Sequence, residues 1–212
     1  PFGIETLLSP HTAKAPFDRA NERLKEDGFT AMGLLKQFRV AVVCSTDDPT
    51  DTLEVHARLA QRKDPDTQVF PTWRPDKAVL VEDLATWTAW LGKLEKVAGV
   101  EIGAWDALLA VLEKRHTLFH ERGCRASDHG LEVIDAEPFT DEVAAGLFAR
   151  LRAGKPLDAG EARVFRSALL HRLALLDHAR GWVQQYHFGA MRNNNTRMKR
   201  RLGPDTGFDS IA

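Results

Sequence analysis

Residues 105–127 read WDALLAVLEKRHTLFHERGCRAS, and this stretch decides the fold. Its first part has apolar and aromatic residues at intervals of three and four, which predicts an amphipathic helix over 105–121. The residues on the apolar face are Trp105, Leu108, Leu109, Leu112, His116 and Phe119. The segment 123–127 that follows is short and apolar, as expected of a strand. A helix followed closely by a strand is the repeating unit of an α/β fold.

The same alternation extends in both directions along the chain. Strands are predicted at 40–44, 68–73, 123–127 and 182–187, the last read as buried through Trp182, Val183 and Tyr186. Helices are predicted between and around them, at 52–62, 82–97, 105–121, 139–152 and 161–180. A crossover between parallel strands needs a dozen or more residues and usually contains a helix. The order therefore predicts a parallel sheet, and four such units would form half of a (β/α)8 barrel.

We expect the chain to consist of two parts. Residues 1–39 read as a helical segment before the first strand, with Ser9 and Pro10 as a plausible helix start. Residues 40–212 read as the partial barrel, with a helical insertion over about 135–180. The insertion is split at AGKPLDAG, residues 153–160, where Asp158 is expected to cap the second helix together with Glu161.

Composition excludes several classes of partner. Of 212 residues, 43% are hydrophobic and 28% are charged, and the formal net charge is -1. Such a balance gives no field for attracting DNA, RNA or an anionic membrane, so no nucleic-acid or membrane partner is expected. No segment approaches the roughly 18 apolar residues of a membrane span, and no signal-peptide pattern is present, which favours a cytoplasmic protein. Cys44 and Cys124 stand alone in apolar stretches and read as small buried hydrophobes.

Polar residues follow each predicted strand, at the sheet edge where α/β proteins bind ligands. After the second strand, Arg74 lies between Trp73 and Pro75, and its guanidinium has the fork geometry that binds a carboxylate. Its stiff neighbours suit substrate binding, with a surface arginine as an equal alternative. After the first strand, Asp47 and Asp48 suit a metal or acid pair, but capping of the next helix is the more frequent use of such a pair.

The third and fourth strands end in titratable residues. Asp128 beside His129 offers a general acid or base tuned by its neighbour, and a buried ion pair of the two is an equal alternative. His187 suits metal ligation or proton donation, with a hydrogen-bonded core histidine as the alternative. His116 and His120 have the spacing of a zinc-protease helix, but Thr117 stands where the glutamate is required, so we expect surface residues.

Arg192 precedes three consecutive asparagines, Asn193, Asn194 and Asn195. Amides both donate and accept hydrogen bonds, so the group suits a ligand that carries a carboxylate and several hydroxyls. The rival interpretation is a polar loop built from Asx-turns.

Several segments together resemble one family. They are PFGIETLLSP (1–10), GLLKQFRVAVVCSTDDPTDTLEVH (33–56), WRPDKA (73–78), GCRASDHGL (123–131), RGWVQQYH (180–187), HFGAMRNNNTR (187–197) and LGPDTGFDSI (202–211). In this order they resemble the uronate isomerases, over essentially the whole chain. The resemblance implies a TIM-barrel enzyme of the amidohydrolase superfamily, of which this chain is the central part, strands two to five. It also implies aldose-ketose interconversion of D-glucuronate with D-fructuronate and D-galacturonate with D-tagaturonate.

The resemblance also implies roles for individual residues. Arg74 and Arg192 match residues that contact the hexuronate, with Asn193 and Asn194 beside them. Asp128 matches an acidic residue of the proton transfer, which passes through a cis-enediol. His187 matches a histidine near a divalent metal, Zn or Mn, either as a ligand or as a hydrogen-bonding partner.

The departures from the family concern the metal. The family uses a His-x-His pair and a late aspartate, and the chain contains no His-x-His. Metal ligation is then incomplete, and we expect the 212 residues to be inactive alone, as a piece of a longer protein that begins here at Pro1. The exposed edges of a half-barrel predict association, for example as a homo-oligomer. Two rivals are a non-catalytic sugar-acid-binding or assembly module and a metal-dependent hydrolase of the same superfamily.

Overall fold

A computed structural model describes residues 2–62, 67–204 and 206–211 of the chain. The chain forms two units, one of Pro1–Val43 with Arg58–Val69 and the other of Cys44–Ala57 with Phe70–Ala212. The strands β1 and β2 each run through the boundary. We describe each unit by itself.

The first unit contains short helices ahead of the sheet. They are α1 (Lys14–Arg23), the 3-10 helix η1 (Asp27–Phe29) and α2 (Ala31–Gln37). Helix α1 begins at Lys14, later than the predicted start at Ser9 and Pro10. Ser9 instead caps the turn that precedes α1, because its Oγ atom accepts from the Thr12 amide at 3.2 Å. Helix α2 has an N-cap instead at Thr30, whose side chain accepts from the Gly33 amide at 3.1 Å. Pro1 lies outside the described residues.

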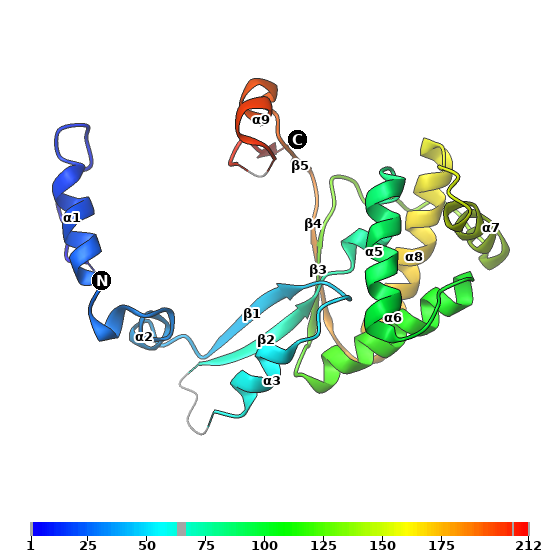
Figure 1. Cartoon of the computed structure of the whole chain (residues 1–212), viewed down its shortest axis with the longest axis horizontal. Helices are drawn as coiled ribbons and strands as arrows, with labels where there is room; N and C mark the ends of the chain where they lie inside the picture. Colours follow the sequence, from blue (N-terminus) through cyan, green and yellow to red (C-terminus); the bar gives the residue numbers. More distant parts are fainter. Residues whose placement is uncertain (1, 63–66, 205, 212) are drawn as a thin grey trace. The chain divides into compact units, whose positions relative to one another are not determined.

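Four strands form one sheet in the order β1-β2-β3-β4 (Figure 1). They are β1 (Val42–Asp47), β2 (Gln68–Trp73), β3 (Ala126–Gly130) and β4 (Val183–His187). β2 pairs with β3 in parallel, and β3 pairs with β4 in parallel. Between β1 and β2, the Gln68 amide donates to Ala41 and the Arg74 amide donates to Asp47, a constant offset that makes this pair parallel as well. The predicted parallel α/β fold is confirmed.

Two strands end later than predicted. β1 reaches Asp47 and β3 reaches Gly130, so both include polar residues that read as post-strand loops. β3 also starts later, because Gly123 has a φ of 92° and belongs to the turn that ends the preceding helix. The strands thus carry Asp47, Asp128 and His129 within the hydrogen-bonded sheet rather than on free loops.

The helices of the chain around and after the sheet match the predicted ones closely. They are α3 (Glu54–Ala60), α5 (Leu84–Ala98), α6 (Trp105–Glu121), α7 (Asp141–Arg152) and α8 (Ala159–Ala179). The capping box at the start of α8 is confirmed, since Asp158 accepts from the Glu161 amide and Glu161 accepts from the Asp158 amide, each at 2.9 Å. Short elements that were not predicted are α4 (Asp76–Val79), β5 (Ala190–Met191), α9 (Thr196–Leu202) and β6 (Ser210–Ile211).

Helices cover one face of the sheet in the second unit. Trp73 of β2 is fully buried and makes an edge contact with Phe119 of α6, with ring centroids 4.8 Å apart. Gln184 of β4 donates to the Ala174 carbonyl of α8 at 2.9 Å. The alternate residues of β4 point away from the helices, which leaves Val183 64% exposed and His187 61% exposed at its side chain. The expectation of a buried last strand is therefore wrong for Val183.

The structure also tests the expectations for the two cysteines, for His116 and for membrane-spanning helices. Cys124 is buried as expected, and burial raises the pKa of its thiol to about 11, but Cys44 is exposed. His116 is completely buried rather than on the surface, because Asp177 of α8 lies 2.9 Å from its Nε2 atom and Trp182 stacks on its ring. Among the described residues, no helix has the length and apolar character needed to cross a membrane.

Candidate active site

The carboxyl ends of the strands in the second unit border a cavity of about 730 Å³. Its lining residues come from the ends of β1 and β3 and from the segments that follow β1, β2, β3 and β4. They are Thr46, Asp48, Asp51, Arg74, Asp76, Lys77, Leu80, Gly130, Glu132 and Arg192. Its lining carries charged side chains of both signs, and this sheet edge is where ligands bind in α/β folds.

Arg74 is held at the floor of this cavity. It is the first residue after β2, and its amide donates to the Asp47 carbonyl at 2.9 Å. Its Nη2 atom lies 3.1 Å from Asp128 Oδ2, and its Nε atom lies 3.4 Å from Asp76 Oδ2. The side chain is 33% exposed, so it pairs with two carboxylates while still facing solvent.

Asp128 and His187 meet across two neighbouring strands. Pairing of β3 with β4 sets Asp128 beside Gln185, two residues before His187 and on the same face. Asp128 Oδ1 lies 2.7 Å from His187 Nδ1, and the contact is an ion pair when the imidazole is protonated. Only 9% of the Asp128 side chain is exposed, against 61% of His187. A largely buried carboxylate thus contacts an accessible imidazole at the open face of the sheet.

The predicted partnership of Asp128 with His129 does not form. Successive residues of a strand point to opposite faces, so His129 lies on the helix side of β3. There its Nδ1 atom is 3.0 Å from Asp76 Oδ1, and its ring stacks on Tyr186. Asp128 instead contacts Arg74 and His187.

Arg192 lines the cavity, whereas the asparagines after it build a loop. β5 pairs antiparallel with β6, and this brings Asp209 to Arg192. Arg192 Nη1 donates to Asp209 at 2.8 Å, and the Asn193 amide donates to the same carboxylate at 2.8 Å. The hydrogen bond from the Asn193 amide, followed by that from Arg192, lowers the pKa of Asp209.

The other two asparagines are used within the same loop. The Asn194 amide group donates to Ser210 Oγ at 2.6 Å. Asn195 is the N-cap of α9, because its Oδ1 atom accepts from the Met198 amide at 3.1 Å. Asn195 therefore caps a helix rather than closing an Asx-turn, because the bond comes from the third residue on. The structure places Arg192 but not Asn193 or Asn194 among the cavity-lining residues.

Asp47 and Asp48 do not cap a helix, because α3 begins only at Glu54. Asp47 accepts from Ser45 Oγ at 2.7 Å and lies 3.7 Å from His56 Nε2. Asp48 accepts from the indole of Trp90 at 2.9 Å, and its carboxylate lies 3.3 Å from Lys77 Nζ. Lys77 was missed in the sequence because α4 has four residues and shows no periodic pattern.

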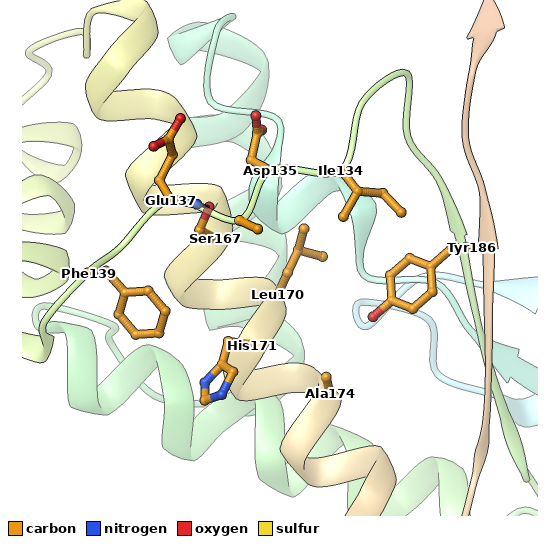
Figure 2. Close-up of a pocket in the computed structure, with 10 residues that line it drawn as sticks. Ile134, Asp135, Glu137, Phe139, Ser167, Leu170, His171, Ala174 and Tyr186 are labelled. Atoms are coloured by element: carbon orange, nitrogen blue, oxygen red, sulfur yellow. Dashed lines mark hydrogen bonds between the residues drawn. The ribbon is translucent and has the colours of Figure 1, made fainter.

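A second cavity, of about 320 Å³, lies on the helix side of β4. Figure 2 shows the ring of Tyr186 extending from β4 toward α8, with Leu170 and Ala174 on the opposite wall. Burial, and then the charge of Asp177, raises the pKa of the Tyr186 phenol. No residue of the predicted site lines this cavity, so we assign it no part in substrate binding.

The described residues do not complete a metal centre. Over 2–62, 67–204 and 206–211, no group of three or more His, Cys, Asp or Glu side chains is placed to hold a metal ion. His187 has Nδ1 at Asp128, which leaves Nε2 as the ring nitrogen able to coordinate an ion. A single imidazole is fewer donors than the three or more protein ligands usual for Zn²⁺.

Comparison with known proteins identifies the family of the chain. The family model described as glucuronate isomerase matches residues 1–212. The chain belongs to this family. Uronate isomerase from Cellvibrio japonicus is 49% identical over 212 residues, which is 100% of this chain and 45% of that protein. Uronate isomerase from Bacteroides thetaiotaomicron is 46% identical over 99% of this chain and 45% of that protein.

Solved structures of the glucuronate isomerase family share the fold. Uronate isomerase from Thermotoga maritima is 29% identical with a TM-score of 0.90, covering 100% of this chain and 46% of that one. Glucuronate isomerase from Caulobacter crescentus is 26% identical with a TM-score of 0.89, covering 100% of this chain and 43% of that one. The chain therefore spans less than half the length of the relatives it matches. The segments WRPDKA and GCRASDHGL, which carried the resemblance, are the ones that contain Arg74 and Asp128.

Proposed function

We propose that this chain is the central part of a uronate isomerase, which interconverts D-glucuronate with D-fructuronate and D-galacturonate with D-tagaturonate. The observation that carries the proposal is the cluster of Arg74, Asp128 and His187 at the carboxyl edge of the sheet, beside a polar cavity that Arg192 also lines. Membership of the glucuronate isomerase family supports the same reaction.

Two arginines are suited to the carboxylate of the sugar acid. The ion pairs of Arg74 involve Nε and Nη2, and its Nη1 atom carries two further N–H groups in the same plane. Arg192 is 51% exposed at its side chain and is oriented by Asp209. A guanidinium binds a carboxylate through paired hydrogen bonds, each charge-assisted bond contributing about 1.5–3 kcal/mol. We propose that Arg74 and Arg192 bind the hexuronate, with Asn193 and Asn194 setting the loop that presents Arg192.

The pair of Asp128 and His187 is suited to proton transfer. Aldose-ketose isomerisation moves a proton between C1 and C2 of the sugar, so one group must accept it from one carbon and return it to the other. Asp128 is held by Arg74 and His187, and Arg74 itself lines the cavity. Because the two groups are in contact, we propose that they exchange the proton as one coupled unit.

The divalent metal that the family resemblance implies, Zn or Mn, would polarise the oxygens of the substrate. The described residues do not fit a complete site for it, because no group of three or more His, Cys, Asp or Glu side chains among them is placed to hold an ion. We propose that the other ligands lie outside the described residues, and that the 212 residues alone therefore do not turn over hexuronates.

For the architecture, we propose that residues 40–212 form strands two to five of a (β/α)8 barrel, with a helical insertion over about 135–180 and a helical segment at 1–39 ahead of it. The sheet supports this because one face is covered by helices while the other, bearing Val183 and His187, is open, as the inner face of a partial barrel would be. The open face and sheet edges also favour assembly, and we propose a homo-oligomer.

The test is an isomerase assay on D-glucuronate and D-galacturonate with added Zn²⁺ or Mn²⁺. It compares the full gene product that contains these residues with the 212-residue chain. Ketose formation by the full product alone is the expected result. Binding of hexuronate without ketose formation by either protein would replace the enzyme by a sugar-acid-binding module, and release of a hydrolysis product would replace it by a hydrolase.

A further inference from the structure

Asp76, the first residue of α4, contacts His129, Gly130 and Arg74. Its Oδ1 atom accepts from His129 Nδ1 at 3.0 Å. Its Oδ2 atom accepts from the Gly130 amide at 2.7 Å and lies 3.4 Å from Arg74 Nε. The Asp76 side chain is 12% exposed, so these contacts are shielded from water.

His129 is itself fixed by its surroundings. Its side chain is 1% exposed, and its ring lies nearly parallel to Tyr186, with centroids 4.8 Å apart and an interplanar angle of 11°. A carboxylate only accepts hydrogen bonds, so Nδ1 of His129 carries the proton of this contact. The orientation of Asp76 is thereby set from the helix side of the sheet, behind the cavity.

Gly130 completes the support for Arg74. A Cβ atom at this position would lie 2.8 Å from Arg74 Nη2, closer than side chains approach. The Gly130 backbone thus donates to Asp76 and also leaves the space that the guanidinium occupies.

We infer that Asp76 and His129 are positioning residues that hold the Arg74 guanidinium in the orientation that binds the substrate carboxylate. The inference rests on the proposed function for the identity of that carboxylate. A long arginine side chain loses rotamer freedom when it binds an anion, and a group already ordered loses less. His129 and Asp76 lie outside the residues that the sequence resemblance assigned to the site.

The first test is steady-state kinetics of the full gene product on D-glucuronate with three substitutions. Asp76→Asn removes the charge and His129→Phe keeps the ring but removes the donor. His129→Asn places an amide N–H near the position of Nδ1. The first two are expected to raise KM by about tenfold with kcat within about twofold, since a misplaced binding group weakens ground and transition states alike. His129→Asn is expected to restore most of the loss.

A double-substitution cycle separates positioning from general structural damage. In an Arg74→Lys background, Asp76→Asn is expected to cause no further rise in KM, because it acts through the arginine. Asp106→Asn, an exposed carboxylate in the first turn of α6, is the matched control and leaves KM unchanged. Additive effects of Asp76→Asn and Arg74→Lys, or an unchanged KM in both Asp76→Asn and His129→Phe, would overturn the inference.

A second readout does not depend on turnover. Arg74 Nε is buried and lies 3.4 Å from Asp76 Oδ2 as an ion pair without hydrogen-bond geometry. We expect this burial beside the carboxylate to slow exchange of the Nε proton with water, which an arginine-selective NMR experiment measures. Asp76→Asn, or Gly130→Ala if the first variant does not fold, is expected to speed this exchange by about tenfold. If the wild-type protein forms no ketose, the proposed function fails, and exchange alone decides the inference: faster exchange supports it and unchanged exchange overturns it.

Discussion

Two histidine-aspartate pairs lie at different places in the second unit and differ in their surroundings. His116 and Asp177 join α6 to α8, are 0% and 1% exposed, and are stacked against Trp182. His187 and Asp128 lie on β4 and β3, are 61% and 9% exposed, and are next to Arg74. The same two residue types are thus enclosed by aromatic rings in one region and lie beside an arginine with an accessible imidazole in the other.

This difference indicates that the function of a histidine-aspartate pair depends on its burial and on the residues that surround it. A pair enclosed by Trp73 and Trp182 is inaccessible to substrate, and its contact joins two packed helices. A pair beside an arginine at a sheet edge can be reached by substrate, and its proton can be transferred. The predictions below test this division, from the largest expected effect to the smallest.

Loss of the Asp128 carboxylate should abolish most of the isomerase activity. Asp128→Asn keeps the size of the side chain but removes the proton acceptor, so kcat of the full gene product on D-glucuronate should fall about 100- to 10,000-fold. Ketose formation measures the loss, and the thermal unfolding midpoint should change little. A kcat within a few-fold of wild type would remove Asp128 from the reaction.

Loss of the enclosed imidazole should act on stability instead. His116→Phe keeps a ring stacked near Trp182 but leaves Asp177 as an unpaired buried charge, so the free energy of unfolding should fall by about 3–5 kcal/mol. Urea denaturation measures this change. His178→Phe, on the exposed surface of α8, is the control and should change stability little. Equal effects of the two substitutions would contradict a structural role for the enclosed pair.

The thiols should report the same contrast between open and sealed regions. Cys44 is exposed, whereas Cys124 is buried with its pKa raised to about 11. Thiolate is the reactive form, so at pH 8 one thiol per folded chain should react rapidly with an aromatic disulfide reagent and a second only after unfolding. Rapid reaction of both thiols in the folded chain would show that Cys124 is accessible to the reagent and not buried before β3.

The contact of Asp209 with Arg192 and Asn193 should be lost only at acid pH. The Asn193 amide and Arg192 lower the pKa of Asp209 below its usual 3.8. A lowered folded-state pKa means that this contact stabilises the loop above pH 3.8 and is lost as pH falls through the lower folded value. The shift of the Asn193 amide in an NMR titration should therefore have its midpoint below 3.8, and a midpoint at or above that value would show that the contact does not form in solution.

Local patterns predicted much of the fold. The apolar spacing in 105–121 matched α6, and the Asp158–Glu161 capping box formed as expected, because helix periodicity and capping depend on residues close in sequence. The strand ends were less predictable, since β3 continues through Asp128 and His129 only because their side chains have partners on other elements.

The candidate site residues could be predicted from the sequence, but the contacts between them could not. Arg74, Asp128, His187 and Arg192 were singled out as strand-end residues, and the structure places Arg74 against Asp128 and Asp128 against His187. The contact of Asp76 with His129 spans 53 positions, and that of His116 with Asp177 spans 61. No local pattern reports such pairs, so the supporting residues behind Arg74 and the enclosed pair could be found only in the structure.

The most direct test of the division between the two pairs is a crystal structure of the full gene product with D-glucuronate bound. We predict that the sugar occupies the cavity at the carboxyl edge of the sheet, with its carboxylate hydrogen-bonded to Arg74 or Arg192 and its C1 and C2 atoms next to Asp128. A sugar bound away from this cavity, or bound there without contact to either arginine, would contradict the account.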